Sequence, residues 1–213
     1  MVSIFTETGT DLRTTPVQLR SAERMTALLD AAAQIIHEEG IDAVSTTAVA
    51  YKSGSSVGVL YRYFPNIDSL LRALAQRNLS LYLARVEEGA DSSPNEPWSS
   101  WDRTLDSFVE LCRSEPGFRA LRFGEIITDR FLSEDESNNS VIARAFASMV
   151  SAAHDVPITE EMLFHLEVAV TMGQGLLSMA FRTSPEGDQR TIEEARRVIG
   201  EYLRNSIPVR ASE

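Results

Sequence analysis

The chain has 213 residues, of which 43% are hydrophobic and 24% are charged, a balance that is ordinary for a globular protein long enough to bury a core. No apolar run approaches the roughly 20 residues of a membrane span, and the first residues lack the basic start and apolar core of a signal peptide. Cys112 is the only cysteine, which excludes an internal disulfide framework and a thiolate metal site. We therefore expect a cytoplasmic protein without a membrane partner.

The formal net charge of -11 is unevenly distributed. Up to Arg85 the chain carries eight basic and eight acidic residues, whereas the remainder carries twelve basic and twenty-three acidic ones. A polyanion such as DNA would be repelled by the second part but not by the first. Bulk charge thus permits nucleic-acid binding by the N-terminal part without arguing for it.

The first predicted helix follows a short irregular segment. Residues 1–16 mix Thr, Gly, Asp and Pro without periodicity, and we expect a mobile N-terminal arm there. Between residues 17 and 39, apolar residues recur at spacings of three and four, which predicts an amphipathic helix that stops at Gly40. Its predicted apolar stripe consists of Met25, Leu28, Leu29, Ala32, Ile35 and Ile36.

Two short helices separated by a glycine turn are predicted next. Ser45 is a good N-cap for the first of them, which ends near Gly54, and the second covers about residues 56–63 and stops before a proline. A helix of about two turns is too short to be a good core element, but this geometry suits a helix held off the body for insertion into a DNA groove. A longer helix then reaches about Glu88.

The remainder of the chain is predicted to be helical throughout. A segment rich in Ser, Pro, Asn and Glu over 91–97 marks a domain boundary, and no alternating strand pattern follows it. We expect helices over residues 98–114, 118–131, 140–154, 159–182 and 191–207. The helix over 159–182 is apolar nearly all round, so it must be covered on several sides by its own domain, a ligand or another subunit.

The segment around the two short helices resembles the Tet repressor (TetR) family of one-component bacterial regulators. The matching residues cover about 20–75 and are Glu39, Gly40, Val49, Ala50, Gly54, Ser56, Gly58, Leu60, Tyr61, Tyr63, Phe64, Leu70 and Leu71. Two departures stand out, because the family usually has Lys at the position of Ile67 and Val at that of Ser55. Losing the Lys would remove one phosphate contact.

The resemblance implies an all-α, homodimeric transcriptional regulator, most simply a repressor that binds a palindromic operator in double-stranded DNA and is released by a small-molecule effector. The implied domains are a mobile arm (1–16), a three-helix helix-turn-helix DNA-binding domain with a connecting helix (17–85) and a helical effector-binding and dimerisation domain (86–213). No enzymatic activity, cofactor or metal is expected. An alternative is a ligand-independent DNA-binding dimer whose C-terminal domain only dimerises.

The candidate DNA contacts follow from the predicted faces of the two short helices. Arg62 is the only long donor on the second helix and suits a base edge or a phosphate, while Val59 suits a thymine methyl group. Hydroxyl groups at the helix starts and on the two tyrosines suit phosphate oxygens. The full candidate set is Ser45, Thr46, Thr47, Ser56, Val57, Gly58, Val59, Tyr61, Arg62 and Tyr63.

Candidate effector contacts are less specific, because plain core and dimer packing explains most of the same aromatic and methionine residues. The set comprises Trp101, Phe108, Phe118, Arg122, Met149, Met172 and Gln174. His37, His154 and His165 lie on separate predicted helices, so we expect helix-end or surface positions for them instead of a metal site. Cys112 is expected to be a small buried residue.

One motif points to a different class of protein. Residues 54–58 satisfy G-x-S-x-G, the nucleophile elbow of α/β-hydrolases, which places the serine between a strand and a helix. Here a helix is predicted on both sides, and no strand is predicted that could build the sheet. An all-helical enzyme or carrier would instead need converging titratable groups in the C-terminal part, and none is visible in the sequence.

Overall fold

The computed structural model describes residues 16–88, 99–123 and 138–207, and every regular element among them is helical. The elements are α1 (Pro16–Glu39), the 3-10 helix η1 (Ile41–Ala43), α2 (Thr46–Lys52), α3 (Val57–Tyr63), α4 (Ile67–Glu88), α5 (Ser99–Ser114), α6 (Phe118–Phe123), α7 (Asn138–His154), α8 (Glu160–Ala180) and α9 (Gln189–Ser206). The all-α prediction is confirmed.

The predicted helix boundaries agree with these elements to within about two residues wherever the structure describes them. The predicted helix over 118–131 is described only as far as Phe123. The boundary segment 91–97 and the arm, apart from Pro16, lie outside the described residues. Met25 was predicted on the apolar stripe of α1, but it is largely exposed because the packed part of that helix begins near Leu28.

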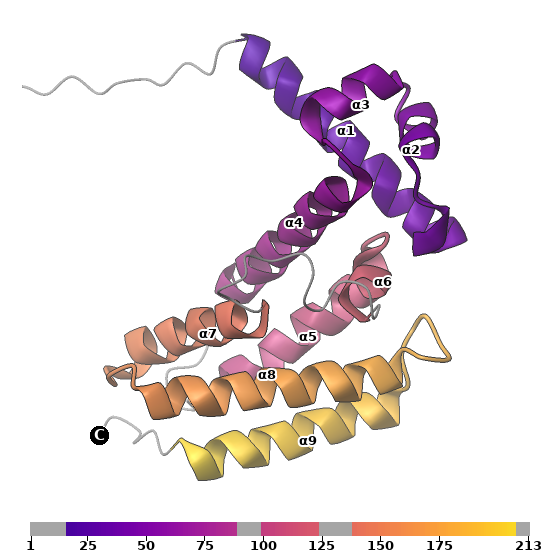
Figure 1. The fold of residues 1–213 in the computed structure, drawn as a ribbon. Helices are drawn as coiled ribbons and strands as arrows, with labels where there is room; N and C mark the ends of the chain where they lie inside the picture. Colours follow the sequence, from indigo (N-terminus) through magenta and orange to yellow (C-terminus); the bar gives the residue numbers. More distant parts are fainter. Residues whose placement is uncertain (1–15, 89–98, 124–137, 208–213) are drawn as a thin grey trace, which may run out of the picture.

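Helices α1, α2 and α3 pack around one hydrophobic cluster with the first half of α4 (Figure 1). Leu28 and Ile35 of α1, Val49 of α2 and Leu60 of α3 are almost wholly inaccessible to solvent. Burying such a side chain contributes roughly 1.5–3 kcal/mol. The two short helices are therefore held by their inward faces alone, which leaves their outer faces available.

Helix α4 connects this cluster to the rest of the molecule (Figure 1). Leu70 and Leu74, near its start, belong to the first cluster, whereas Tyr82 and Val86, near its end, belong to a second cluster with α5, α6 and α8. Arg85 ties the end of α4 to α5 through an ion pair of 3.1 Å with Glu110. Any tilt of α4 therefore moves α1, α2 and α3 relative to the C-terminal helices.

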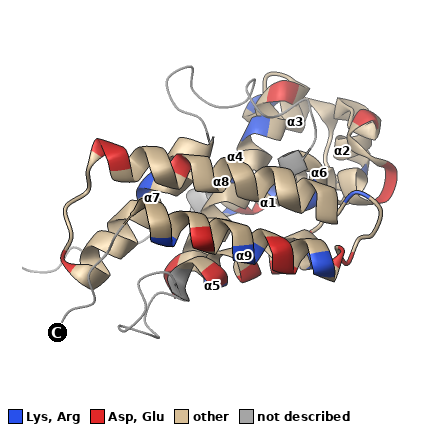
Figure 2. Cartoon of the chain, turned by 90° about the horizontal axis from the view of Figure 1, so that it is seen from below, with Lys and Arg blue, Asp and Glu red and all other residues tan. Residues whose placement is uncertain are grey.

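The long C-terminal helices α8 and α9 lie side by side and cover one face of the molecule (Figures 1 and 2). Thr159 and Asp188 cap their N-termini by accepting hydrogen bonds from the backbone of Met162 and Thr191. A third cluster, which includes Phe146, Leu166, Ala195, Ile199 and Leu203, joins them to α7. The apolar stripe of α9 is thereby buried inside the chain.

A second contact between the two parts comes from the turn between α5 and α6. Gly117 has φ +73, and a Cβ atom there would lie 2.9 Å from the carbonyl oxygen of Ala33 in α1. Real Cβ atoms essentially never approach so closely, so the turn packs directly on the α1 backbone. Leu121 of α6 joins the first cluster.

None of the described helices combines the length and the apolar character that crossing a bilayer requires.

Candidate nucleic-acid interface and internal cavity

The turn between α2 and α3 is built from local capping interactions. Ser45 Oγ accepts a hydrogen bond from the backbone of Ala48 at 3.2 Å, and Ser56 Oγ accepts one from Val59 at 3.3 Å. Gly54 adopts φ +66, a left-handed conformation that costs glycine nothing. The N-cap predicted at Ser45 is thus confirmed, and the Ser56 cap fixes where α3 begins, while its inward packing on α1 holds it in place.

The outer face of α3 presents polar and aromatic groups. Leu60 and Phe64 are buried, as their spacing of four predicted. This orientation leaves Tyr61 and Arg62 exposed and Val57 and Val59 half-buried. Tyr63 is half-buried, and its hydroxyl lies 3.1 Å from Ser21 Oγ of α1, so it is already engaged within the protein.

Helix α2 adds a residue that the sequence analysis missed. Tyr51 is 91% exposed, the largest exposure among the large hydrophobic side chains described. It follows exposed Thr47 by four positions, so both lie on one helix face. That spacing was readable in the sequence, whereas exposure was not. Lys52, the next residue, is bound to Glu38 of α1 and belongs to the scaffold.

Ile67, which stands where the resemblance leads one to expect Lys, begins α4 and packs against the first cluster. The backbone at this helix start is capped by Asn66, whose side chain accepts a hydrogen bond from Ser69 N at 2.8 Å. An apolar contact thus replaces a cationic group here. The G-x-S-x-G motif follows α2 instead of a strand, so its serine is a helix cap and not a nucleophile elbow.

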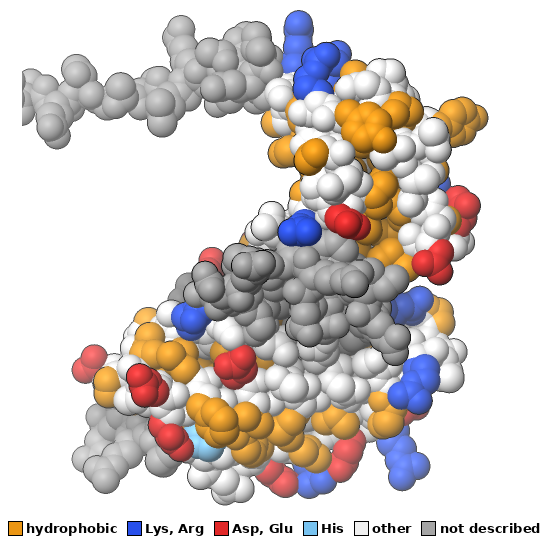
Figure 3. Space-filling model, in the orientation of Figure 1, with side chains coloured by type: hydrophobic (Ala, Val, Ile, Leu, Met, Phe, Trp, Pro, Cys, Tyr) orange, Lys and Arg blue, Asp and Glu red, His pale blue; other side chains and the backbone are white. Residues whose placement is uncertain are grey.

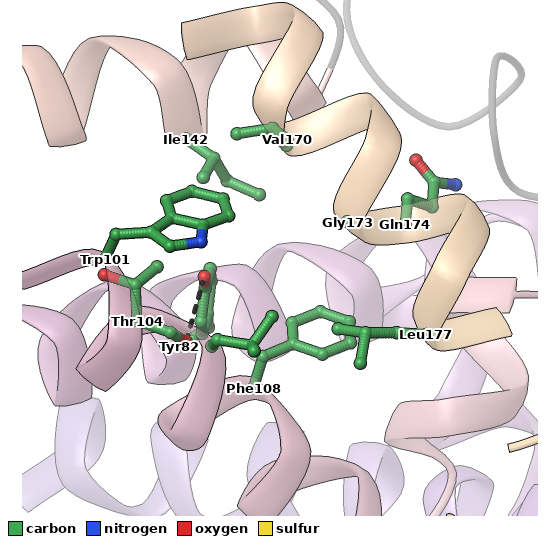
Figure 4. A pocket seen from close by; sticks show the side chains of 10 residues that line it. Tyr82, Trp101, Thr104, Phe108, Ile142, Val170, Gly173, Gln174 and Leu177 are labelled. Atoms are coloured by element: carbon green, nitrogen blue, oxygen red, sulfur yellow. Dashed lines mark hydrogen bonds between the residues drawn. The ribbon is translucent and has the colours of Figure 1, made fainter. Parts of the chain in front are cut away.

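A pocket lies between α4, α5, α7 and α8 (Figure 4). Its volume is about 370 Å³ when the part open to solvent is counted. The lining residues are Tyr82, Trp101, Thr104, Leu105, Phe108, Ile142, Val170, Gly173, Gln174 and Leu177. Trp101, Phe108 and Gln174 were candidate effector contacts, whereas the others were not singled out because the lining is assembled from four helices, of which α4 and α7 contribute one residue each.

The polar groups around the pocket are few and differ in their partners. The Tyr82 hydroxyl donates to the carbonyl oxygen of Thr104 at 3.4 Å, and Gln174 Oε1 accepts from Asn139 Nδ2 at 3.2 Å. Trp101 Nε1 is buried and has no hydrogen-bond partner among the described residues. The pocket walls are otherwise apolar.

The remaining candidate effector residues lie elsewhere. Phe118 does not line the pocket but packs on Phe108, with ring centroids 5.4 Å apart. Met149 is half-buried between the second and third clusters, and Met172 lies beside Phe164 in a shallow depression on the outer side of α8. The Arg122 side chain lies outside what the structure describes.

The outer side of α8 exposes large apolar side chains. Phe164 is 59% exposed and Met179 is 49% exposed, and Figure 3 shows hydrophobic side chains gathered along this helix. Isolated exposed apolar residues are normal on protein surfaces, but a contiguous row of them indicates an interaction surface. The sequence predicted that α8 is covered on several sides. Among the described residues, its outer face is instead exposed to solvent.

The histidines occupy three different environments. His37 and His154 lie in the last turns of α1 and α7, as predicted. The prediction is wrong for His165, which is half-buried within α8 with Nδ1 2.7 Å from the Tyr202 hydroxyl of α9 and Nε2 3.1 Å from Glu161 Oε1. Packing of α9 on α8 covers the ring, and helix spacing alone does not reveal such a partner. Cys112 is buried, as predicted.

Comparison with known proteins agrees with these observations over most of the chain. The family model of bacterial regulatory proteins of the tetR family matches residues 28–74, and that of the tetracyclin repressor-like C-terminal domain matches residues 95–207. A TetR-family transcriptional regulator from Streptomyces coelicolor has a solved structure that is 33% identical, with a TM-score of 0.75 over 88% of this chain and 99% of that one.

More distant relatives share part of the sequence or the fold alone. The HTH-type transcriptional regulator UidR of Escherichia coli K12 is 30% identical over 49% of this chain and 51% of its own. The nucleoid occlusion factor SlmA of Actinobacillus pleuropneumoniae is 28% identical over 51% of this chain and 52% of its own. The chain thus spans about half the length of the curated relatives it matches. RolR, solved in complex with resorcinol, is 15% identical with a TM-score of 0.58 over 91% of this chain and 99% of that one, which shows the fold alone.

Two short capped helices with exposed outer faces, a bundle of longer helices and family models that cover both parts lead to one conclusion: the chain belongs to the TetR family of DNA-binding bacterial transcriptional regulators.

Proposed function

We propose that the chain is a dimeric repressor that binds a palindromic operator and is released when a small molecule enters the pocket between α4, α5, α7 and α8. Residues 17–85 form the DNA-binding domain in this proposal, and residues 86–213 bind the effector and dimerise. The observation that carries it is that α4 takes part in both sites. One end of α4 lines the apolar pocket, and the other end packs against the helix-turn-helix.

The DNA contacts are assigned to the outer faces of α2 and α3. Arg62 and Tyr61 are exposed on α3, and Thr47 and Tyr51 are exposed on α2. Arg62 takes the base edge or phosphate, and the hydroxyl groups position the helix on the backbone. The remaining contacts come from the helix starts and the side of α3, namely Ser45, Thr46, Ser56, Val57, Gly58, Val59 and Tyr63.

Dimerisation is assigned to the outer face of α8. Its exposed Phe164 and Met179, with half-buried Met172 on the same face, lose contact with water only if another molecule covers them. In contrast, the outer face of α9 carries charged residues that pair with one another, such as Arg197 with Glu194 at 2.6 Å. A second copy seated on α8 buries apolar surface and leaves those charges hydrated, and it also holds two α3 helices at a defined separation for a two-fold symmetric operator.

Effector binding is coupled to DNA binding through α4 and through the α5–α6 turn. Phe108 lines the pocket and packs on Phe118, which directly follows Gly117, and Gly117 packs on the Ala33 backbone of α1. A molecule that displaces Phe108 therefore pushes a chain of tightly packed groups toward α1. A change in the spacing of the two α3 helices by this route needs an effector that binds the released state more tightly by a few kcal/mol.

A second candidate is a DNA-binding dimer whose C-terminal helices only dimerise. The observation in its favour is that the pocket is partly open and small, so most of the C-terminal part is ordinary packed core. A relative that matches about half of this chain is named a nucleoid occlusion factor, a name that mentions the nucleoid and no small-molecule effector.

Selection of bound duplexes from a random DNA pool tests the DNA-binding half of the proposal. Enrichment of a palindrome, with a complex of two chains per duplex by light scattering, is the expected outcome. Recovery of duplexes without a shared sequence would contradict it. Titration of small molecules against the selected duplex complex then separates the two candidates, because the second one predicts no change in operator affinity when the pocket is filled.

A further inference from the structure

We propose that the pocket between α4, α5, α7 and α8 takes a small, neutral, largely apolar molecule that carries a hydrogen-bond acceptor, and that this acceptor pairs with Trp101 Nε1. The inference rests on the proposed function, since it names the chemical class of the effector. Its basis is a buried donor that faces the pocket.

The Trp101 side chain is fixed by its surroundings. It is 4% exposed, and its ring meets that of Phe146 edge to face, with centroids 5.5 Å apart at 83°. In Figure 4 the indole nitrogen points into the space bounded by Tyr82, Ile142 and Gly173. A ligand in that space therefore lies on the side of the ring that carries the N–H group.

The indole N–H group is a donor and cannot accept. It has no partner among the described residues, and a buried donor without a partner is unfavourable because it has lost its hydrogen bond to water. The neighbouring polar groups are engaged differently, since Tyr82 donates to Thr104 and Gln174 accepts from Asn139. A carbonyl, ether or hydroxyl oxygen on the ligand satisfies Trp101 Nε1 directly.

The walls select against charge. None of the lining residues in the described part of the chain is acidic, basic or histidine. An ion that enters such a site gives up its hydration without gaining a counter-charge, which makes anions and cations poor occupants. The aromatic and aliphatic walls supplied by Phe108, Val170 and Leu177 favour an apolar body in their place.

Size is limited in the same way. The volume of about 370 Å³ includes space that is open to solvent, and the centre of a water-sized group can occupy only about 30 Å³ of it. Even a molecule with a single small ring must therefore displace the walls to enter, so small molecules are favoured. Larger molecules must move Phe108, which packs on Phe118.

Three probes of one shape separate these requirements. Acetophenone is neutral and carries one carbonyl acceptor, ethylbenzene has a similar shape without an acceptor, and benzoate is an anion. Their dissociation constants are measured by titration calorimetry against the full-length wild type, Trp101→Phe and the control Tyr202→Phe, whose hydroxyl lies beside His165 and outside the pocket. Trp101→Phe keeps an aromatic ring but removes the donor together with part of the indole, a loss of wall that both neutral probes share, and its thermal melt verifies folding.

The decisive quantity is the ratio of the ethylbenzene and acetophenone dissociation constants, because intrinsic differences in hydrophobicity between the two probes cancel between proteins. We expect this ratio to fall by roughly 2- to 12-fold from wild type to Trp101→Phe, the range of one neutral hydrogen bond, and to stay constant in Tyr202→Phe. We also expect benzoate to bind weakest. An unchanged ratio in Trp101→Phe, tightest binding of benzoate or no binding of any probe would each overturn the inference.

A second readout does not depend on the variant. In wild type labelled with ¹⁵N at the indole, acetophenone should shift the Trp101 N–H proton downfield and ethylbenzene should not. Equal shifts with both probes would overturn the pairing. Operator affinity, measured separately with and without acetophenone, reports on the proposed function, so a site that binds acetophenone through Trp101 without releasing DNA contradicts that function while leaving this inference intact.

Discussion

Replacing Gly117 with alanine tests the contact between the α5–α6 turn and α1. Gly117 and Gly54 have similar positive φ angles of +73 and +66, so alanine at either position carries a left-handed penalty of roughly 1–2 kcal/mol. The surroundings differ. A Cβ atom at Gly54 meets nothing within 4 Å, whereas one at Gly117 lies 2.9 Å from Ala33 O and 3.3 Å from Ala33 Cα.

Both close atoms at Gly117 belong to the backbone, so no side-chain rotation relieves the overlap. Overpacking of this kind costs roughly 1–3 kcal/mol. The change in unfolded-chain entropy is common to both variants and cancels in their comparison. We therefore expect Gly117→Ala to be less stable than Gly54→Ala by about 1–3 kcal/mol.

Urea unfolding at one fixed protein concentration measures this difference, since the stability of a dimer depends on concentration. Gly54→Ala serves as the matched control, and both midpoints are compared with that of the wild type. Equal midpoints and slopes for the two variants would mean that the α5–α6 turn moves to accommodate the added methyl group at no cost in free energy. The proposed route from the pocket to α1 would then lose its rigid link.

Three further outcomes are expected. Arg62→Ala should weaken operator binding by roughly 1–3 kcal/mol in a fluorescence-anisotropy titration if the residue meets a base edge. Arg182→Ala is the control and should leave the affinity unchanged. Equal affinities for both variants would remove Arg62 from the interface. Phe164→Glu should shift the dimer toward monomer in sedimentation experiments, because a charge then lies on the apolar face of α8; an unchanged mass would place dimerisation elsewhere. Hydrogen bonds donated by Thr191 hold the pKa of Asp188 below the usual range of an aspartate. This stabilisation is present above the unfolded pKa and is lost as pH falls through the folded one, so the melting temperature of Asp188→Asn should vary less between pH 7 and 3 than that of the wild type, and parallel profiles would refute the assignment.

The sequence alone did not identify which residues line the pocket. Trp101 and Phe108 were proposed as effector contacts on composition alone, together with Phe118 and Met172, which the structure places outside the lining. Core, pocket and surface all select the same apolar residue types, so only the mutual placement of the helices distinguishes them. Tyr82 was not proposed, because its role depends on α5 and α8 packing beside α4.

The short-helix region, by contrast, was determined by the sequence itself. The caps at Ser45 and Ser56 and the left-handed turn at Gly54 depend on partners within four positions, and such local interactions can be read from the sequence. Only the tertiary structure decided three other features, namely the unpaired N–H donor of Trp101, the contact of the α5–α6 turn with α1 and the exposed face of α8. The physical reason is that each of them depends on which helices pack together, and helical periodicity tells which face of a helix is apolar but not what covers it.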